Sequence, residues 1–390
     1  MLKFLDSFDH YQTSEITKKY TQIYWDAISG PQTTPAIGPY GRRGTNGVQW
    51  AADDNPGSIG EVVQTTDPTA IVGLAFRAET GGTFGNLSYG DNLYPTWNGS
   101  GWNASIQPTP ILIYIRNQSF TQTAVRLNRN GTLSIVQAGD GFIVEGVVNV
   151  YDTTTQALQV GQYYYIEYKT LIDSTVGTVE LWVNCDMWLR VTGVNTIGQQ
   201  AANPGTARWD EFVYGRLRLY GAPTDLVYQM DDLYAADGDA SDPTNTIVDV
   251  MGDIAIDYRK PTADAVVAWT PLSGPSNYLM VDEVPPDDDA SYNSTITPGN
   301  TDTFDHESAV IPGQNILAQQ VVYDRRRPQA GATSTQPVFR VGGVDYVTTA
   351  AGDPTDYQFH RGIWTQNPAT LAPLTDTVFN ASPIGYKKVT

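Results

Sequence analysis

Residues 161–184 read GQYYYIEYKTLIDSTVGTVELWVN and contain the clearest strand pattern of the chain. Apolar side chains occupy every second position on both sides of a short polar turn, as Ile166 and Tyr168 do before it and Leu181 does after it. Alternation with a period of two places one face of a strand in a core and the other toward solvent. The stretch therefore predicts an antiparallel hairpin over residues 162–183, with Ile166 and Leu181 facing the core.

Short strands and turns continue from about residue 40 to residue 239. Residues 214–237, YGRLRLYGAPTDLVYQMDDLYAAD, repeat the alternation and contain the acidic step Asp231-Asp232. The Asn-Gly step at Asn130 predicts a hairpin, because glycine tolerates the positive φ of a tight turn. Further strands are predicted at residues 70–78, 111–116, 124–128, 132–136 and 141–150. This spacing, with hardly any helical periodicity, predicts a sandwich of two antiparallel sheets.

The composition favours an all-β protein of two domains. The 390 residues include 23 Tyr, 9 Trp, 36 Gly and 24 Pro, and only 17% of them are charged. Aromatic residues favour pleated, half-buried surfaces, whereas Gly and Pro favour turns. The 41% apolar content is enough for a core. No apolar run approaches the ~18 residues of a membrane span, and the length predicts two domains.

The charge balance argues against nucleic acid as a partner. The formal net charge is −19, and phosphate binding needs a basic footprint. Arg325, Arg326 and Arg327 form the only basic run, which we interpret as a solvated strand end or an ion pair between subunits. The single cysteine, Cys185, follows an alternating strand, so we interpret it as a small buried or half-buried side chain in a protein made in a reducing cytoplasm.

The N-terminal residues differ from the strands that follow. Residues 1–11 read MLKFLDSFDHY, and a short helix with a Thr or Ser cap is predicted over residues 13–20. A segment this apolar must cover either its own sandwich or a neighbouring protein, because burying each large side chain is worth ~1.5–3 kcal/mol. We predict a docking or packing segment over residues 1–30 whose assembly residues are Phe4, Phe8, Tyr11 and Tyr20.

A polar stretch separates two predicted domains. Residues 236–243, ADGDASDP, end in proline as linkers do. The first domain is then a β-sandwich over residues 31–242, and the second is a further β-sandwich over residues 243–390. Strands of the second domain are predicted at residues 254–258, 266–270, 277–281, 317–324, 338–341 and 345–348.

The residue spacing predicts no catalytic residue and no enzyme. Sandwich-fold glycosidases place paired carboxylates on one strand as Glu-x-Asp-x-Glu, and this spacing is absent. The adjacent acids Asp231 and Asp232 point to opposite faces of a regular strand, so they do not flank one bond. His10, His306 and His360 are scattered without zinc spacing, and Gly-x-Ser-x-Gly and Walker loops are absent. We interpret His10 as a packed or capping residue.

We predict no metal site and no cofactor, and calcium is the alternative that two acidic loops leave open. Residues 237–242, DGDASD, begin like a carboxylate loop but lack the sixth-position Gly and the twelfth-position acid of an EF-hand. Residues 287–289 are three aspartates behind two prolines. The other interpretation of each loop is a solvated acidic linker.

A loop rich in Gly and Asn carries three aromatic residues that are candidates for carbohydrate binding. Tyr94, Trp97 and Trp102 lie in residues 89–102, YGDNLYPTWNGSGW. Rings on loops stack on sugar faces, and nearby Asn or Asp side chains bond sugar hydroxyls. These rings equally suit a cap on the sandwich or a contact buried in a neighbouring subunit.

Two resemblances give these patterns a context. Residues 161–184 and 214–237 resemble the late strands of the concanavalin A/laminin G-like jelly roll, a fold that binds or builds more often than it catalyses. The opening MLKFLDSFDHY, followed by KKY, resembles the start of tailed-bacteriophage virion structural proteins that carry such a domain directly behind it. Segments that resemble the C-terminal domain of the same proteins are residues 276–292, 315–327 and 364–387.

The resemblance implies a non-enzymatic structural protein on the exterior of a virion, synthesised in the host bacterial cytoplasm. Its place would be that of a capsid decoration or fibre-like protein, or of a tail or baseplate component. Its partners would be other virion proteins and further copies of the chain as a homo-oligomer. Two alternatives stay open, a tail protein that binds a host-surface glycan and an enzyme that degrades surface polysaccharide.

Overall fold

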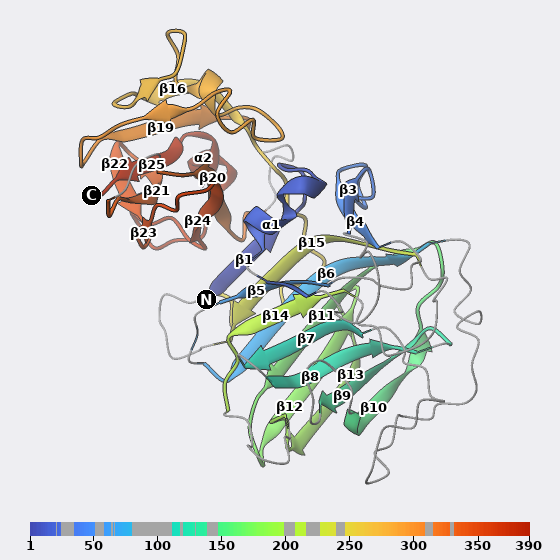
Figure 1. Cartoon of the computed structure of the whole chain (residues 1–390). Coiled ribbons are helices and arrows are strands. Elements are labelled where there is room, and N and C mark those ends of the chain that lie inside the picture. Colours follow the sequence, from blue (N-terminus) through green and yellow to red (C-terminus); the bar gives the residue numbers. More distant parts are fainter. Residues whose placement is uncertain are drawn as a thin grey trace. The chain divides into compact units, whose positions relative to one another are not determined.

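The structure is a computed structural model of the 390-residue chain (Figure 1). It describes residues 1–20, 22–24, 35–50, 58–63, 65, 67–79, 111–117, 120–128, 130–138, 147–198, 207–215, 227–238, 246–308, 315–327 and 331–390. Unit 1 comprises Met1–Asp9 and Tyr20–Ile256, and unit 2 comprises His10–Lys19 and Asp257–Thr390. Strands dominate both units, which confirms the predicted all-β class. None of the described helices has the length and apolarity needed to cross a membrane.

Unit 1 is a jelly-roll sandwich of two antiparallel sheets, as predicted. Sheet A has the order β13-β12-β11-β6-β15-β4-β3, with β1 beside β15. Its strands are β1 (Leu2–Asp6), β3 (Ala36–Gly38), β4 (Gly47–Trp50), β6 (Thr69–Ala78), β11 (Tyr163–Leu171), β12 (Gly177–Val183), β13 (Asp186–Val194) and β15 (Tyr228–Asp237).

Sheet B has the order β10-β9-β8-β7-β14-β5-β2. Its strands are β2 (Gln22–Tyr24), β5 (Ser58–Val62), β7 (Ile111–Asn117), β8 (Phe120–Leu127), β9 (Thr132–Ala138), β10 (Val147–Ala157) and β14 (Glu211–Tyr214). The hydroxyl of Tyr214 donates to the carbonyl of Tyr234 at 2.7 Å, and the ring of Phe212 lies 5.2 Å from that of Phe4. These side chains of β14 thus reach sheet A and place the core between the two sheets.

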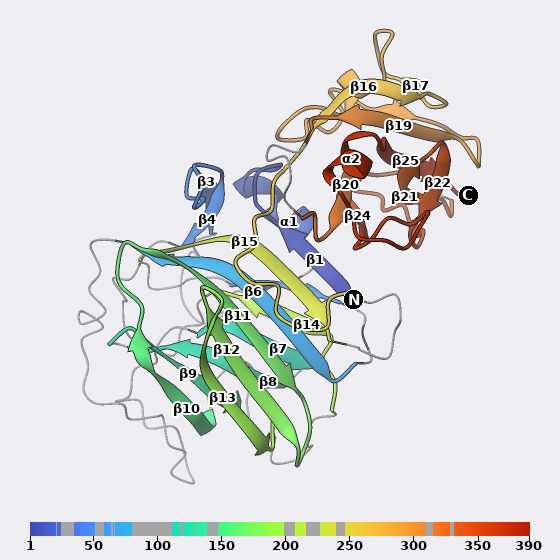
Figure 2. The same cartoon turned by 180° about the vertical axis from the view of Figure 1, so that it is seen from behind.

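The predicted hairpin is confirmed. Strands β11 and β12 pair antiparallel, with Ile166 opposite Val183 and Tyr168 opposite Leu181. Ile166 and Leu181 are both fully buried. The residues between them along each strand, such as Glu167, project from the other face, which we call the outer face of sheet A. Figure 2 shows sheet A from this side.

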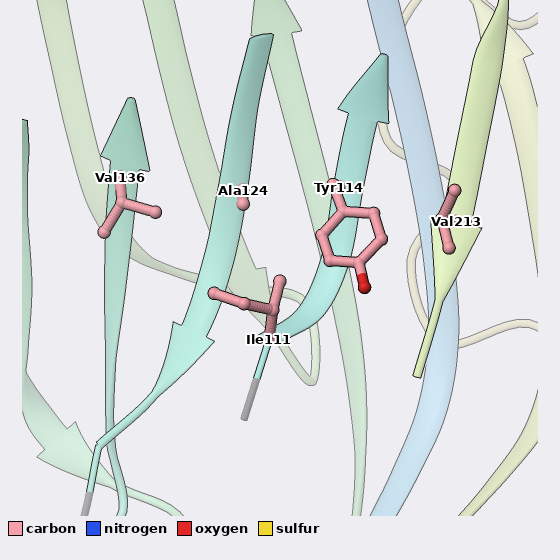
Figure 3. Packing of buried hydrophobic residues seen from close by; sticks show 5 residues of the cluster. All are labelled: Ile111, Tyr114, Ala124, Val136 and Val213. Atoms are coloured by element: carbon pink, nitrogen blue, oxygen red, sulfur yellow. The ribbon is translucent and has the colours of Figure 1, made fainter. Parts of the chain in front are cut away.

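Strand β7 of sheet B is covered on both faces. Every residue of β7 is buried, as a continuous apolar strand requires when both of its faces are covered. One row of cross-strand neighbours runs through four strands of this sheet (Figure 3). The row and the buried cluster around it consist of Ile111, Tyr114, Ala124, Val136 and Val213.

The N-terminal segment packs inside its own chain. Strand β1 pairs with β15, and Phe4, Phe8 and Tyr20 contact one another in unit 1, with Phe4 and Tyr20 ring centroids 5.4 Å apart. Tyr11 belongs to unit 2, where its ring lies 5.9 Å from that of Phe359. The four predicted assembly residues are at most 2% exposed. Their side chains therefore cover their own chain, which is the first of the two alternatives that the sequence left open, and their role in assembly stays a prediction.

Unit 2 is the second predicted β-sandwich. A six-stranded sheet has the order β16-β19-β25-β21-β22 with β23 beside β21, and β20-β24 and β17-β18 form two-stranded sheets. The strands are β16 (Pro261–Val266), β17 (Thr270–Pro271), β18 (Asn293–Ser294), β19 (Thr301–His306), β20 (Gln319–Arg325), β21 (Ser334–Val341), β22 (Val344–Val347), β23 (Ala351–Gly352), β24 (Gln358–Trp364) and β25 (Ile384–Lys388). Val321, Phe339 and Trp364 form the core between β20-β24 and the larger sheet.

Four short helical segments are described, η1 (Thr13–Glu15), α1 (Ile16–Lys19), η3 (Tyr278–Met280) and α2 (Asp376–Asn380). The first two confirm the helix predicted over residues 13–20, but its cap is Gln12, whose backbone N–H donates to Glu15 Oε2 at 3.1 Å. The strands predicted at residues 254–258 and 277–281 are wrong. Side-chain carboxylates bind the backbone there instead, as Asp264 does by accepting from the N–H groups of Asn277 and Tyr278.

The two units meet in sequence at Ile256 and Asp257, later than the predicted boundary at residue 242. Residues 239–243 of the predicted linker lie outside the described residues. Residues 247–256 belong to unit 1, because side chains of sheet A and of the loop before β4 hold their backbone, as described next.

Candidate functional site

The acidic step on β15 forms a bulge that brings two carboxylates together. The register of β15 against β6 shifts between Asp231 and Tyr234, and Asp232 has a φ of 51°. A bulge takes successive side chains out of the regular alternation. The backbone N–H of Arg42 donates to Asp231 Oδ2 at 3.1 Å, and Arg42 Nε donates to Asp232 Oδ2 at 2.8 Å. The prediction that Asp231 and Asp232 point to opposite faces is wrong, because it assumed a regular strand.

Arg42 is the cation of this cluster. Its side chain is 10% exposed, and its guanidinium lies 5.0 Å from the centre of the Tyr165 ring. It also donates to the carboxylate of Asp253 and to the carbonyl of Ile254. One guanidinium thus joins β15, β11 and the chain that leads to unit 2. Such a fork of donors suits several oxygen acceptors at once.

Glu167 is a second buried acid on the outer face of sheet A, and is 1% exposed. Its Oε1 accepts from the Tyr234 hydroxyl, from the Met251 N–H at 2.7 Å and from the Gly252 N–H at 3.0 Å. Tyr234 reaches it because the strand between them carries Gly73, where a Cβ would lie 2.1 Å from the Tyr234 ring. Gly73 therefore makes room for this hydrogen bond.

Burial raises the pKa of the acids in this cluster. It raises the pKa of Glu167 to about 7, against the hydrogen bonds from Tyr234 and the main chain. Burial and the neighbouring charge of Asp232 raise the pKa of Asp231 to about 8, and burial raises the pKa of Asp9 to about 6. The pKa of Asp232 is raised by burial, which outweighs the Ile256 N–H and Arg42. Acids that titrate near neutrality mark a candidate functional site.

In unit 2 three acids surround an internal ammonium group. Carboxylate oxygens of Glu15, Asp288 and Asp324 lie within 4.8 Å of one another. Lys18 Nζ lies 2.7 Å from Asp288, 3.2 Å from Asp324 and 3.4 Å from Glu15. Burial acts to lower the pKa of Lys18, but Asp288 and Asp324 raise it overall. The lysine side chain thus supplies the positive charge that a divalent cation would bring to these oxygens.

The three aspartates of residues 287–289 bind separate partners. Asp287 accepts from the N–H and the hydroxyl of Ser291, and Asp288 binds Lys18. Asp289 accepts from Arg326 and from the Tyr357 hydroxyl. Side chains that diverge in this way do not form one set of calcium ligands. In the other acidic loop, residues 239–242 lie outside the described residues.

Several residues singled out from the sequence are placed by the structure. Cys185 is exposed, in the turn between β12 and β13 with a φ of 69°, so the interpretation as a buried thiol is wrong. Arg325 pairs with Asp353 at 2.6 Å inside unit 2, and Arg326 is exposed and pairs with Asp289. His10 is packed as expected, with Nε2 2.9 Å from Lys19 Nζ, and burial lowers its pKa. Tyr94, Trp97 and Trp102 lie outside the described residues.

Arg42, Glu167 and Tyr234 are not predicted as site residues by the sequence pattern. Glu167 occupies an outward position of an alternating strand, which the pattern assigns to solvent. The signal that marks this place is Gly73, an isolated glycine inside the apolar strand AIVGLAF. An isolated glycine in a strand often marks the close approach of another group, and here that group is the Tyr234 ring.

No family model and no curated protein sequence matches the chain. Similar solved structures include the endo-β-1,4-glucuronan lyase of Trichoderma reesei, at 10% identity and a TM-score of 0.34, covering 56% of this chain and 96% of that one. The PL-14 alginate lyase of Aplysia kurodai aligns at 8% identity and a TM-score of 0.36, covering 56% and 91%. The receptor-binding domain of botulinum neurotoxin D aligns at 8% identity and a TM-score of 0.31, covering 55% and 44%. Likeness at this level transfers no activity to this chain.

Proposed function

We propose that this protein is a non-enzymatic structural component on the exterior of a tailed-bacteriophage particle, and that it acts by protein–protein assembly. The proposal starts from the opening MLKFLDSFDHY, which resembles that of such virion proteins. The structural observation that supports the non-enzymatic part is that the acids of both clusters already accept hydrogen bonds or form ion pairs within the chain. Arg42 and main-chain N–H groups bind the carboxylates of unit 1, and Lys18 binds those of unit 2. Acids bound in this way stabilise a fold and leave a substrate little access.

Unit 2 offers apolar side chains for contacts with other proteins. Exposed large side chains supply the area that a protein–protein interface buries. Those of unit 2 include Ile296 at 95%, Leu371 at 67%, Val344 at 53% and Val267 at 52%. The buried N-terminal residues, in contrast, belong to the fold itself. We therefore propose that the contact surface uses exposed apolar side chains of unit 2, and not the buried side chains of the first twenty residues.

The deciding experiment locates the chain in an intact particle. Purified particles are imaged by electron cryomicroscopy, with an antibody to unit 2 as a label, and the protein is quantified by mass spectrometry. We expect a fixed number of copies on the outside of the capsid or tail. Absence of the chain from purified particles would refute the proposal.

Two assays of the purified protein test the alternatives. Turnover of a surface polysaccharide that is lost in Glu167→Gln would replace the proposal with an enzyme. Binding to a host glycan that is lost in Trp97→Ala, and kept in the control Trp188→Ala on β13, would replace it with a glycan-binding tail protein. The structural proposal predicts a negative result in both assays.

A further inference from the structure

The chain that leads from unit 1 into unit 2 is attached to sheet A by side chains. We call residues 247–256 the connector. No strand or helix is described in it, so its backbone does not take part in the regular hydrogen bonds of a sheet or a helix. Its N–H groups instead donate to side chains, those of Met251 and Gly252 to Glu167 and that of Ile256 to Asp232 Oδ1 at 2.7 Å.

Further side chains hold the same connector from outside the buried acids. Lys169 Nζ lies 2.9 Å from the carboxylate of Asp249 and donates to the carbonyl of Val248 at 3.3 Å. The N–H of Asp253 donates to Cys185 Sγ at 3.3 Å. Glu167 and Asp232 are 1% and 2% exposed, so the strongest of these attachments lie beneath the connector, away from water.

We propose that the connector is a pH-dependent latch, held on the outer face of sheet A by Glu167 and Asp232 and released when the buried acids beneath it ionise. Carboxylate charge is costly to bury, and opening the connector admits water to these acids. Release frees the backbone of residues 247–256 from the outer face of sheet A and exposes Glu167 and Asp232 to water.

The direction of the pH effect follows from the change in proton affinity. Burial raises the pKa of Glu167 to about 7 from the ordinary 4.5, so the latched state binds protons more tightly than the opened state. Raising the pH therefore favours opening, from above about 4.5 until Glu167 is fully ionised above about 7.

Other groups around the latch set its strength. Arg42 is the main counter-charge, and it acts against release by favouring the ionised acids in the latched state. The charged and titratable groups that face the buried acids from every neighbouring element are Asp9, Arg42, Arg43, Tyr165, Lys169, Cys185, Asp231, Tyr234, Asp249 and Asp253.

Hydrogen exchange of single backbone amides in the full-length protein tests the latch. The protection of the Met251, Gly252 and Ile256 amides is measured from about pH 5 to about pH 8 and corrected for the intrinsic exchange rate. We expect protection to fall by up to about tenfold per pH unit, since one proton is released per opening. The amide of Leu181 in β12 serves as the reference, because global unfolding changes it together with the connector.

Two variants separate the acids. Glu167→Gln keeps an acceptor oxygen but cannot ionise, so the Met251 and Gly252 amides should lose most of their pH dependence. Asp232→Asn should act in the same way on the Ile256 amide. The control is Glu180→Gln on β12, whose carboxylate pairs with Arg190 on the same outer face. Connector protection that is independent of pH in the wild type, or equally pH-dependent in all variants, would overturn the proposal.

Discussion

Removing the guanidinium of Arg42 tests the central feature of unit 1. In Arg42→Met the aliphatic stem remains, but Asp232 loses an ion pair of 2.8 Å in which the acid is 3% exposed and the arginine 10%. Breaking a buried pair by removing one partner costs about 3–5 kcal/mol, because the other charge stays buried. We expect about 3 kcal/mol at pH 8, at the low end, since the Ile256 N–H still donates to Asp232.

The loss should depend on pH in a defined direction. Burial already raises the pKa of Asp232 above the ordinary carboxylate range, and without the charge of Arg42 this pKa rises further. A raised pKa in the folded state means that stability falls as pH increases toward that pKa and is regained as pH decreases. At about pH 5 a larger fraction of Asp232 is protonated in the variant than at pH 8, so the loss of stability should be smaller there.

Urea denaturation followed by tryptophan fluorescence measures this free energy, since Trp50 and Trp209 are buried in unit 1. The control is Arg190→Met, whose pair with Glu180 involves an arginine that is 54% exposed and should be worth about 0–1 kcal/mol. Adding Asp232→Asn to Arg42→Met should restore at least half of the lost stability. A loss equal to that of Arg190→Met, or one that does not change with pH, would refute the reasoning.

Three further predictions concern stability. Leu181→Ala removes a fully buried side chain from the core of unit 1 and should cost ~2–5 kcal/mol in the same denaturation experiment, so a change within error would mean that the register is different. Gly73→Ala should cost about 1–3 kcal/mol, because its Cβ displaces the Tyr234 ring, and the chemical shift of the Glu167 carboxyl should report the broken hydrogen bond. Lys18→Met leaves three acids without their ammonium group and should lower the stability of unit 2 by about 1–2 kcal/mol at pH 8 and less at pH 5, because the side chain of Asp324 is largely buried but that of Asp288 is 44% exposed, whereas equal losses at both would argue against the charge cluster.

The sandwich could be predicted from the sequence because its signal is local. Alternation along β11 and β12 identifies the core face residue by residue, and Ile166 and Leu181 are buried as expected. The same alternation gives the wrong environment for the residue that follows Ile166. Glu167 occupies an outward position of β11, which the alternation assigns to solvent, yet the connector covers it through hydrogen bonds from Met251 and Gly252. A contact between residues so distant in sequence produces no periodic pattern in the sequence.

The acidic step shows a second limit of the pattern. Whether Asp231 and Asp232 share a side of the strand depends on a bulge, and the bulge depends on the partner strand and on Arg42. None of these is encoded in the two aspartates themselves. The wrong assignment of Cys185 has a related cause, because the strand ends at Val183 and the cysteine falls in the turn.

The path of the N-terminal segment also explains why no single linker separates the units. Leu2 pairs with Ala236 in sheet A, the next residues after Asp9 belong to unit 2, and the chain returns to unit 1 at Tyr20. Sheet A is therefore complete only after β15 has been synthesised, and unit 2 is complete only when residues 10–19 have joined its C-terminal strands. Contacts between residues so far apart in sequence form late in folding, because the chain loses the entropy of closing a long loop before the contacts stabilise it. Deleting Met1–Tyr20 would then remove a strand from one unit and a helix from the other, so a truncated chain that fails to assemble would report a folding defect and leave the contact surface on unit 2 as the region to mutate.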